Sequence, residues 1–196
     1  MDTKIKSRSR GRPRAFDRDA ALDQAQAMFH AHGYEGVGVA ALAEAMGVNP
    51  PSLYGAFGSK IGLYEEVLRR YSDASPLTDP LDRSGVDTAA ALSDLLVRAA
   101  IVYSADPKAP GCMALEGERS TDSDAACLAR GCRDQNVRLL RDFIGSTHPE
   151  KADVVADYVA AVMSGLSADA RGGHSTERLI AVADMAGLAI GTMLSR

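Results

Sequence analysis

Three cysteines and four histidines are the first side chains of this 196-residue sequence to consider as nucleophiles or metal ligands. Cys112 lies in Pro110-Gly111-Cys112-Met113, where we expect a helix to begin, and a helix N-terminus can make a thiol reactive. Two interpretations stay open for Cys112: a sensor of electrophiles or oxidants, or a small residue of the core. Cys127 and Cys132 fall on different faces of a helix and make a poor metal pair. The histidines also lack ligand spacing, so the sequence predicts neither a metal site nor a cofactor.

Other classes of protein are excluded by what the sequence lacks. It has no nucleophile elbow, phosphate loop or zinc motif, so we do not expect an enzyme. No apolar run approaches the roughly 20 residues that span a bilayer, and the basic N-terminus is not followed by the apolar region of a secretory signal. An odd number of cysteines does not suit a disulfide framework. These features favour a cytoplasmic protein with no membrane partner.

A second kind of chemistry, the binding of a polyanion, is indicated by the N-terminal segment. Arg10, Arg12 and Arg14 alternate with Gly11 and Pro13, and this pattern is similar to the core of an AT-hook, an extended peptide that lies in the minor groove of A/T-rich DNA. The first 14 residues hold six basic side chains and one acid, whereas residues 73–196 hold 12 Lys and Arg against 18 Asp and Glu. Such a segment can be a DNA-binding arm or only a solvated tail, and the elements that follow it must decide.

Those elements are expected to be short helices with clear start and stop signals. Asp17 can cap a first helix that ends at Gly33. A second helix is expected at about residues 38–46. Asn49 can cap a third, with Pro50 and Pro51 in positions where an amide is not needed. Ser59 can cap a fourth. Helix, glycine-containing turn and short capped helix form the arrangement of a helix-turn-helix, although a three-helix packing unit without a ligand gives the same pattern.

The segment GYEGVGVAALAEAMGVNPPSLYGAFGSKIGLYEEVL, residues 33–68, resembles the DNA-binding domain of the TetR family of bacterial transcription regulators. The matching positions are Gly33-Tyr34, Val39, Leu42-Ala43, Gly47-Val48, Leu53-Tyr54, Phe57, Ser59-Lys60 and Leu63. The remainder resembles a ligand-binding and dimerisation domain of that family, notably in PGCM and in GLSADARGGHSTERL. The resemblance implies an all-α fold: an arm over residues 1–16, a helix-turn-helix domain over residues 17–62, and an effector-binding and dimerisation domain over residues 63–196.

In the family, the tyrosine that matches Tyr54 and the lysine that matches Lys60 contact mainly the phosphates of the duplex. The positions that meet base edges correspond to Pro50, Pro51, Ser52 and Gly55. With the cap and the arm, the DNA-binding residues are expected to be Arg10, Arg12, Arg14, Asn49, Pro50, Pro51, Ser52, Tyr54, Gly55 and Lys60. This sequence departs from the family where Val37-Gly38, Ala40-Ala41 and Ile61 replace polar residues. The recognition surface is therefore poor in hydrogen-bonding groups, which favours a DNA-binding role for the arm.

Helical patterns resume at about residues 87–104, 123–145, 149–171 and 175–194. By resemblance, these helices enclose an effector pocket, for which the expected lining is Leu96, Tyr103, Cys112, Met113, Leu128, Val137 and Leu140. The alternative is that these side chains only fill the core. The last two helices carry small residues at helical spacing, which fits the four-helix bundle of the family's dimer. The expected dimer contacts are Ala161, Gly165, Ala183, Gly187 and Gly191, unless this stripe packs inside its own chain.

We therefore expect a homodimeric repressor that binds a double-stranded operator and is released by a small molecule of unknown identity. One alternative is an activator or architectural DNA-binding protein without an effector. Another is a helical ligand-binding protein whose helix-turn-helix has decayed.

Overall fold

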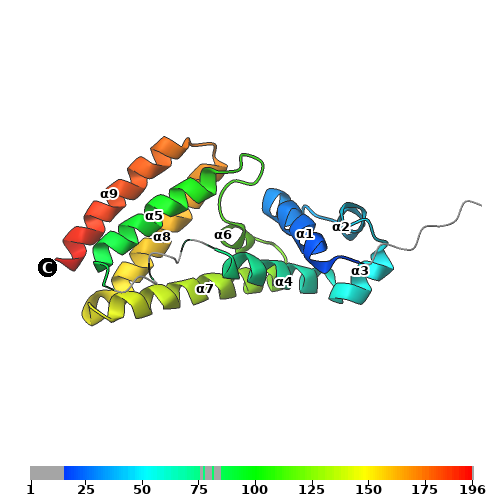
Figure 1. The fold of residues 1–196 in the computed structure, drawn as a ribbon, viewed down its shortest axis with the longest axis horizontal. Helices are drawn as coiled ribbons and strands as arrows, with labels where there is room; N and C mark the ends of the chain where they lie inside the picture. The colour runs from blue at the N-terminus through cyan, green and yellow to red at the C-terminus, as the bar shows by residue number, and fades with distance from the viewer. Residues whose placement is uncertain (1–15, 76, 78–80, 82–84, 196) are drawn as a thin grey trace, which may run out of the picture.

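The computed structural model describes residues 16–75, 77, 81 and 85–195, and in these ranges every regular element is helical (Figure 1). The predicted all-α fold is confirmed. Arg10, Arg12 and Arg14 lie outside the described residues. None of the described helices is long and apolar enough to cross a membrane. The elements are α1 (Arg18–His32), α2 (Val39–Ala45), α3 (Pro50–Phe57), α4 (Lys60–Asp73), α5 (Thr88–Ser104), α6 (Met113–Gly117), α7 (Ser123–Gly145), the 3₁₀ helix η2 (Pro149–Lys151), α8 (Ala152–Arg171) and α9 (Thr176–Leu194).

The three predicted N-caps are present at the starts of α1, α3 and α4. The Asp17 carboxylate accepts from the amide of Ala20, the Asn49 side chain from that of Ser52, and the Ser59 hydroxyl from that of Gly62. Each cap satisfies an amide that has no partner within the helix. Gly58, between α3 and α4, has a φ of +74°, a left-handed conformation that glycine adopts without strain.

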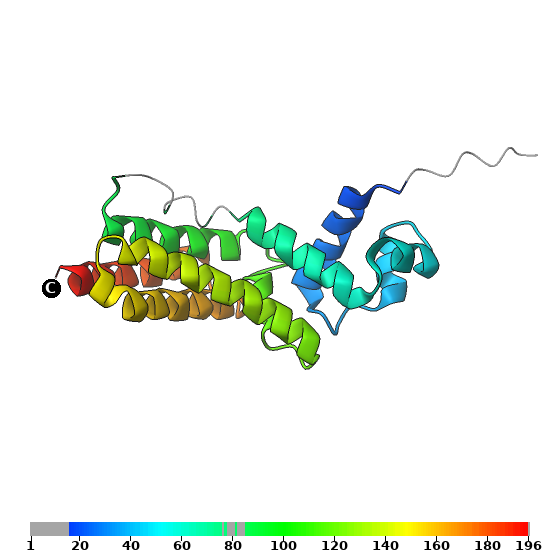
Figure 2. The ribbon, with the colours of Figure 1, turned by 90° about the horizontal axis from the view of Figure 1, so that it is seen from below.

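The hydrophobic core of the helix-turn-helix is completed by residues of α6 and α7. In Figure 2, α4 runs from the small N-terminal helices towards the body and lies beside α7. The predicted boundary at residues 62–63 therefore falls inside α4. Met113 and Ala114 of α6, and Ala125 and Ala129 of α7, are buried together with the core residues of α1–α4. The N-terminal core thus includes side chains supplied by the C-terminal part of the chain.

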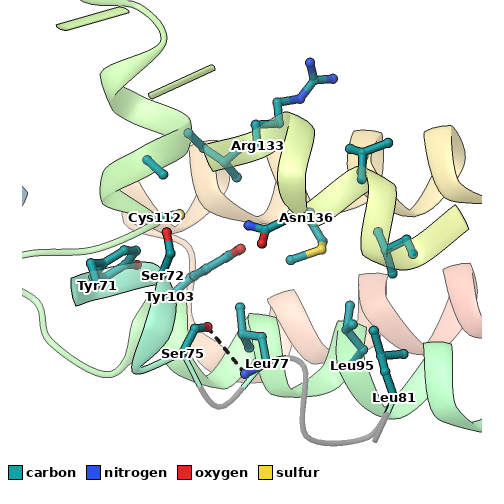
Figure 3. A pocket seen from close by; sticks show the side chains of 16 residues that line it. Tyr71, Ser72, Ser75, Leu77, Leu81, Leu95, Tyr103, Cys112, Arg133 and Asn136 are labelled. Carbon is teal, nitrogen blue, oxygen red and sulfur yellow. Dashed lines mark hydrogen bonds between the residues drawn. The ribbon is translucent and has the colours of Figure 1, made fainter. Parts of the chain in front are cut away.

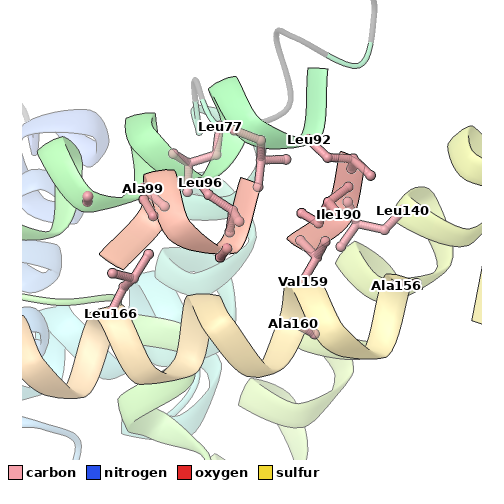
Figure 4. Close-up of a cluster of buried hydrophobic side chains, with 14 of the residues drawn as sticks. Leu77, Leu92, Leu96, Ala99, Leu140, Ala156, Val159, Ala160, Leu166 and Ile190 are labelled. Carbon is pink, nitrogen blue, oxygen red and sulfur yellow. The ribbon is translucent and has the colours of Figure 1, made fainter. Parts of the chain in front are cut away.

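A second core fills the body between α5, α7, α8 and α9 (Figure 4). Its fully buried side chains include Leu92, Leu96, Ile144, Val159 and Ile190. The helices of this core begin and end within a residue of the predicted limits, except that η2 precedes α8 where a single helix was expected.

The stripe of small residues on α9 faces its own chain, which corrects the expectation that Ala183 and Gly187 contact a dimer partner. Ala183 is completely buried. A Cβ atom built on Gly187 would overlap Ser93 Oγ on α5 and come within 3.0 Å of Ser93 Cβ. The small side chain is needed here because α5 and α9 approach closely. Gly191 is half-buried, while Ala161 and Gly165 of α8 are exposed and stay candidates for a dimer contact.

Gly187→Leu should lower the stability of the monomer fold, because overpacking a close helix contact costs about 1–3 kcal/mol. Gly131→Leu on α7 is the matched control, since Gly131 is exposed in a helix and its Cβ would meet nothing within 4 Å. We expect thermal unfolding followed by circular dichroism to show a lower Tm for Gly187→Leu and an unchanged or higher Tm for Gly131→Leu. Equal Tm values in the two variants would contradict the α5–α9 packing described above.

Candidate nucleic-acid interface and effector pocket

The N-terminal part of α3 presents an exposed surface whose residues match the predicted DNA-binding set. Pro50, Pro51, Ser52 and Gly55 are all exposed, and the Tyr54 side chain is 47% exposed. The other face of α3 is anchored, because Leu53 is fully buried and Phe57 is also in the core. The exposed face offers two prolines, one free hydroxyl and one phenol. Asn49 is already engaged as the helix cap, so its side chain serves first to orient α3.

Lys60 lies at the start of α4, directly after the turn that ends α3. Its ammonium nitrogen is 3.9 Å from the centroid of the Tyr34 ring, an attractive cation–π geometry. Partial burial lowers the pKa of Lys60, and the nearby carboxylate of Glu35 opposes that shift. The lysine predicted to contact phosphate is thus held against the α1–α2 turn.

Arg18 holds α1, α3 and α4 together, a role that spacing along the sequence did not reveal. Its Nη1 donates to the carbonyl oxygen of Ala56 at 2.8 Å, and its Nη2 is 2.6 Å from a carboxylate oxygen of Glu66. The guanidinium also lies 4.5 Å from the centroid of the Phe57 ring. These contacts fix the C-terminal end of α3 relative to the other two helices.

Glu35 connects the α1–α2 turn to the start of α7. Its carboxylate accepts hydrogen bonds from the hydroxyls of Ser120 and Thr121 and from the amides of Thr121 and Asp122. Hydrogen bonding, first from the Ser120 hydroxyl and then from the backbone amides of Glu35 and Asp122 and the Thr121 hydroxyl, lowers the pKa of Glu35 to about 2. The charged form of this carboxylate is therefore favoured by the folded state.

Glu35→Gln should lower the Tm near pH 7, because the amide replaces a carboxylate that accepts four hydrogen bonds. The folded-state pKa of Glu35 lies below its ordinary value of 4.5, so its stabilising effect is present above pH 4.5 and is lost as the pH falls towards 2. We therefore expect the Tm difference between the wild type and Glu35→Gln to narrow below pH 4.5. Circular dichroism melts at several pH values would measure it, and a difference independent of pH would contradict this role.

A second connection joins α1 to the segment that leads into α6. His30 Nε2 donates to the carbonyl oxygen of Gly111 at 3.0 Å, and burial lowers the pKa of His30. Arg171, near the end of α8, donates to the carbonyl oxygen of His30 and lies 3.5 Å from a carboxylate oxygen of Glu116. The residue next to Cys112 is thereby in direct contact with the helix-turn-helix domain.

A pocket lies between α4, α5, α7 and α8 and encloses about 80 Å³ (Figure 3). Since one water needs about 10–15 Å³ of such space, a small organic molecule can fit. Its polar end holds Tyr71, Ser72, Tyr103 and Cys112, and leucines line the opposite end. The lining residues are Tyr71, Ser72, Ser75, Leu77, Leu81, Leu95, Tyr103, Cys112, Ala114, Leu115, Arg133, Asn136, Val137, Leu140, Ala160 and Met163.

Four of the predicted pocket residues, Tyr103, Cys112, Val137 and Leu140, are among this lining. The other three are not, which corrects the sequence-based assignment. Leu96 is buried in the body core and Met113 in the N-terminal core, while Leu128 packs against the N-terminal core. Tyr71 of α4 also lines the pocket, although it was not among the residues predicted to do so.

An exposed apolar surface runs along α8 and α9. Its residues are Val154 on α8 and Val182, Met185 and Leu188 on α9, which are 59%, 43%, 72% and 75% exposed. A contiguous exposed apolar patch, unlike singly exposed apolar side chains, is typical of an interaction surface. Ala161 and Gly165 of α8 are also exposed.

Comparison with known proteins identifies the family. The sequence profile described as bacterial regulatory proteins, tetR family, matches residues 21–67. The chain is 44% identical over 196 residues to the HTH-type transcriptional repressor BdcR of Escherichia coli (strain K12), with 99% of both chains covered. It is 33% identical over 193 residues, 92% of each chain, to the HTH-type transcriptional repressor ComR of the same organism.

Solved structures give the same result. A cysteine mutant of the TetR family transcriptional regulator CifR, complexed with 26-bp double-strand operator DNA, is 33% identical to this chain. The two structures align with a TM-score of 0.81 over 91% of this chain and 99% of the other. The sequence identity along nearly the whole chain establishes that this protein belongs to the TetR family of bacterial regulatory proteins.

Proposed function

We propose that the protein is a homodimeric transcriptional repressor that binds operator DNA through α3 and is released by a small molecule in the pocket. The observation that carries the proposal is the exposed, capped N-terminal part of α3, a helix that is anchored by Arg18 at its C-terminal end and by buried Leu53 and Phe57. Its relatives BdcR and ComR are repressors, and CifR was solved on its operator. A rigid helix with one exposed face is what insertion into a major groove requires.

The arm supports this proposal through the charge balance of the helix-turn-helix. Residues 16–62 contain two basic side chains, Arg18 and Lys60, against five acidic ones. Arg18 is paired with Glu66, and Lys60 lies over the Tyr34 ring. Because phosphate binding depends on free cations, most of the electrostatic affinity must come from the six basic residues of positions 1–14. Arg10, Arg12 and Arg14 are proposed to enter the minor groove beside the site of α3.

The exposed apolar residues of α8 and α9 support a dimer. We infer that Val154, Met185 and Leu188 are covered by the same surface of a second copy, because a symmetric dimer places one patch on itself. Ala161 and Gly165 allow close approach of the backbones on α8. The body would then hold two copies of α3 on one face of the duplex, which supplies the specificity that one short helix lacks.

A mobility-shift assay with the intergenic DNA upstream of its own gene tests the proposed function directly. We expect a discrete complex at a protein concentration at which random duplex of equal length stays free. Equal affinity for both duplexes would favour an architectural DNA-binding protein. Absence of any complex would indicate a helical ligand-binding protein whose helix-turn-helix no longer binds DNA.

Tyr54→Phe and Ser52→Ala should separate phosphate contacts from base contacts. Tyr54→Phe removes a hydroxyl that we assign to a phosphate, so binding to operator and to random duplex should fall by similar factors. Ser52 is the residue of the exposed face that can readily donate to a base edge, and Ser52→Ala should weaken operator binding more than random binding. Fluorescence anisotropy would measure the affinity of each variant for the operator and for random duplex. An operator-specific loss for Tyr54→Phe would reverse the assignment.

A further inference from the structure

The exposed face of α3 lacks the side chains that most often read bases through hydrogen bonds. Its exposed residues are Pro50, Pro51, Ser52, Tyr54 and Gly55, and none of the 8 residues of the helix is charged or carries a side-chain amide. Guanine is read mainly by arginine or lysine, and adenine by asparagine or glutamine. The recognition helix therefore has no side chain for either of these direct contacts.

Asn49, which precedes α3, does not supply the missing contact. Its side-chain oxygen accepts a hydrogen bond from the amide of Ser52 at 2.9 Å, whereas the bidentate pair with adenine needs that oxygen together with the amide nitrogen. Besides one hydroxyl and one phenol, the exposed face of α3 offers two proline rings and the bare backbone of Gly55. Apolar groups in the major groove contact the C5-methyl group, which distinguishes thymine from the other bases.

Gly55 is a second and independent observation, because nothing within the chain accounts for a glycine at this position. Gly58 has a left-handed backbone, and a Cβ atom on Gly62 would overlap the carbonyl oxygen of Phe57, so the fold requires both of these glycines. A Cβ atom on Gly55 would meet nothing within 4 Å, and its backbone is not left-handed. Alanine would make the helix more stable. The missing side chain at Gly55 is therefore explained by a partner outside the chain.

The position of Gly55 fits a partner in the major groove. It follows Pro51 by four residues and Ser52 by three, so the three residues are neighbours on one face of the helix. Leu53 and Phe57, by contrast, are buried in the core. In Figure 1, α3 lies at the opposite end of the molecule from the C-terminus. Without a side chain at Gly55, the helix backbone can approach a base edge closely.

We propose that α3 recognises thymine by its methyl group, and that one such methyl group in each half-site occupies the space beside Gly55 and contacts the ring of Pro51. The inference rests on the proposed function and names the base feature that the recognition helix reads. The methyl group is removed from water in the complex, which stabilises the complex through the hydrophobic effect. The hydroxyl of Ser52 lies on the same face and donates to an acceptor on a base edge beside this methyl group.

Operators in which single thymines are replaced by deoxyuridine test the proposal, because deoxyuridine keeps the hydrogen-bonding groups of thymine and lacks only its methyl group. The operator is first located by DNase footprinting of the intergenic DNA upstream of the gene, and each replacement is made in both half-sites. At one thymine position we expect anisotropy titrations of the full-length protein to give an affinity about 15-fold lower, which is about 4-fold for each buried methyl group. Random duplex should bind equally with either base.

Gly55→Ala places a methyl group on the protein where the thymine methyl group would lie. It should raise the Tm, because alanine favours the helix. It should also lower the affinity for the thymine operator by about 10-fold or more, because the contact becomes overpacked. On the deoxyuridine operator the space is vacant, so this variant should bind that operator at least as tightly as the thymine operator, which reverses the preference of the wild type.

Gly131→Ala on α7 is the matched control, since Gly131 is also an exposed helical glycine whose Cβ would meet nothing within 4 Å. It should raise the Tm and keep the affinities of the wild type for both operators. Circular dichroism melts and anisotropy titrations on the same preparations would compare the two variants.

Three results would overturn the proposal. They are an undiminished affinity of the wild type for every deoxyuridine operator, an unchanged affinity of Gly55→Ala for the thymine operator, and a loss of affinity caused by 7-deazaguanine, which lacks the N7 acceptor, but not by deoxyuridine. A wild-type protein that formed no specific complex with the intergenic DNA would instead refute the proposed function, and this inference with it.

Discussion

Removal of residues 1–14 should weaken operator binding and make it much less dependent on salt. Each phosphate neutralised contributes about −0.9 to the slope of log K against log salt. If two cations of each arm contact phosphates, a dimer with two arms loses about 3–4 units of slope. The effect should be large because the helix-turn-helix itself, over residues 16–62, has only two basic side chains, both engaged within the protein. Anisotropy titrations from about 50 to about 200 mM salt would measure it.

Two full-length variants distinguish the effect of the positive charge of residues 1–14 from the effect of the planar shape of their arginine side chains. Replacement of Arg10, Arg12 and Arg14 by Lys keeps the charge but removes the planar guanidinium groups. It should preserve the salt slope and lose the preference for A/T pairs beside the operator, since a narrow minor groove selects arginine. Replacement of the same three arginines by Gln should reduce both the salt slope and the preference for A/T pairs. A truncated protein with the full slope and the same flanking preference would show that residues 1–14 are only a tail.

The double substitution Met185→Glu and Leu188→Glu should yield helical monomers that lose operator binding by about 10³-fold or more. These side chains are 72% and 75% exposed, so charges there cost the monomer little, whereas each would be buried in the proposed dimer. Interface residues of this kind contribute about 2 kcal/mol or more apiece, and a two-fold interface contains each of them twice. Sedimentation velocity, circular dichroism and anisotropy would be run on the same preparation.

Leu139→Glu is the matched control, because Leu139 is 46% exposed on α7, outside the proposed interface. It should stay dimeric and bind the operator as the wild type does. If the double variant on α9 also remained a dimer with unchanged affinity, the α8–α9 surface would have another role, and dimerisation would have to use a different face.

Local signals predicted the helices well. The caps at Asp17, Asn49 and Ser59 are properties of neighbouring residues, so they are readable from the sequence and are present in the structure. Hydrogen bonds between distant segments are not readable in this way. Arg18 is hydrogen-bonded to Ala56, Glu35 to Ser120, and His30 to Gly111. The two residues of each pair are brought together only by the packing of the helices.

The sequence also could not predict which face of a helix packs against which neighbouring helix. Spacing placed Ala183 and Gly187 on one stripe, but it could not show that α5 of the same chain covers that stripe while Met185 and Leu188 stay exposed. The pocket shows the same limit at a single position. Leu95 lines it, whereas the adjacent Leu96 is directed into the core, because consecutive residues differ by about 100° around a helix.

The shared core of α1–α4 with α6 and α7 has a consequence for how such regulators can diversify. Met113, Ala114, Ala125 and Ala129 complete the hydrophobic interior beneath the helix-turn-helix, and Gly117 leaves no space for a Cβ beside Tyr64. The helix-turn-helix domain therefore cannot be exchanged between relatives on its own. In a chimera that joins this domain to the body of a relative, the shared core would be poorly packed unless α6 and the first turns of α7 were transferred with the domain. Changes of operator specificity along this lineage are then expected to arise by substitution on the surface of α3 and in the arm, rather than by recombination at the start of α4.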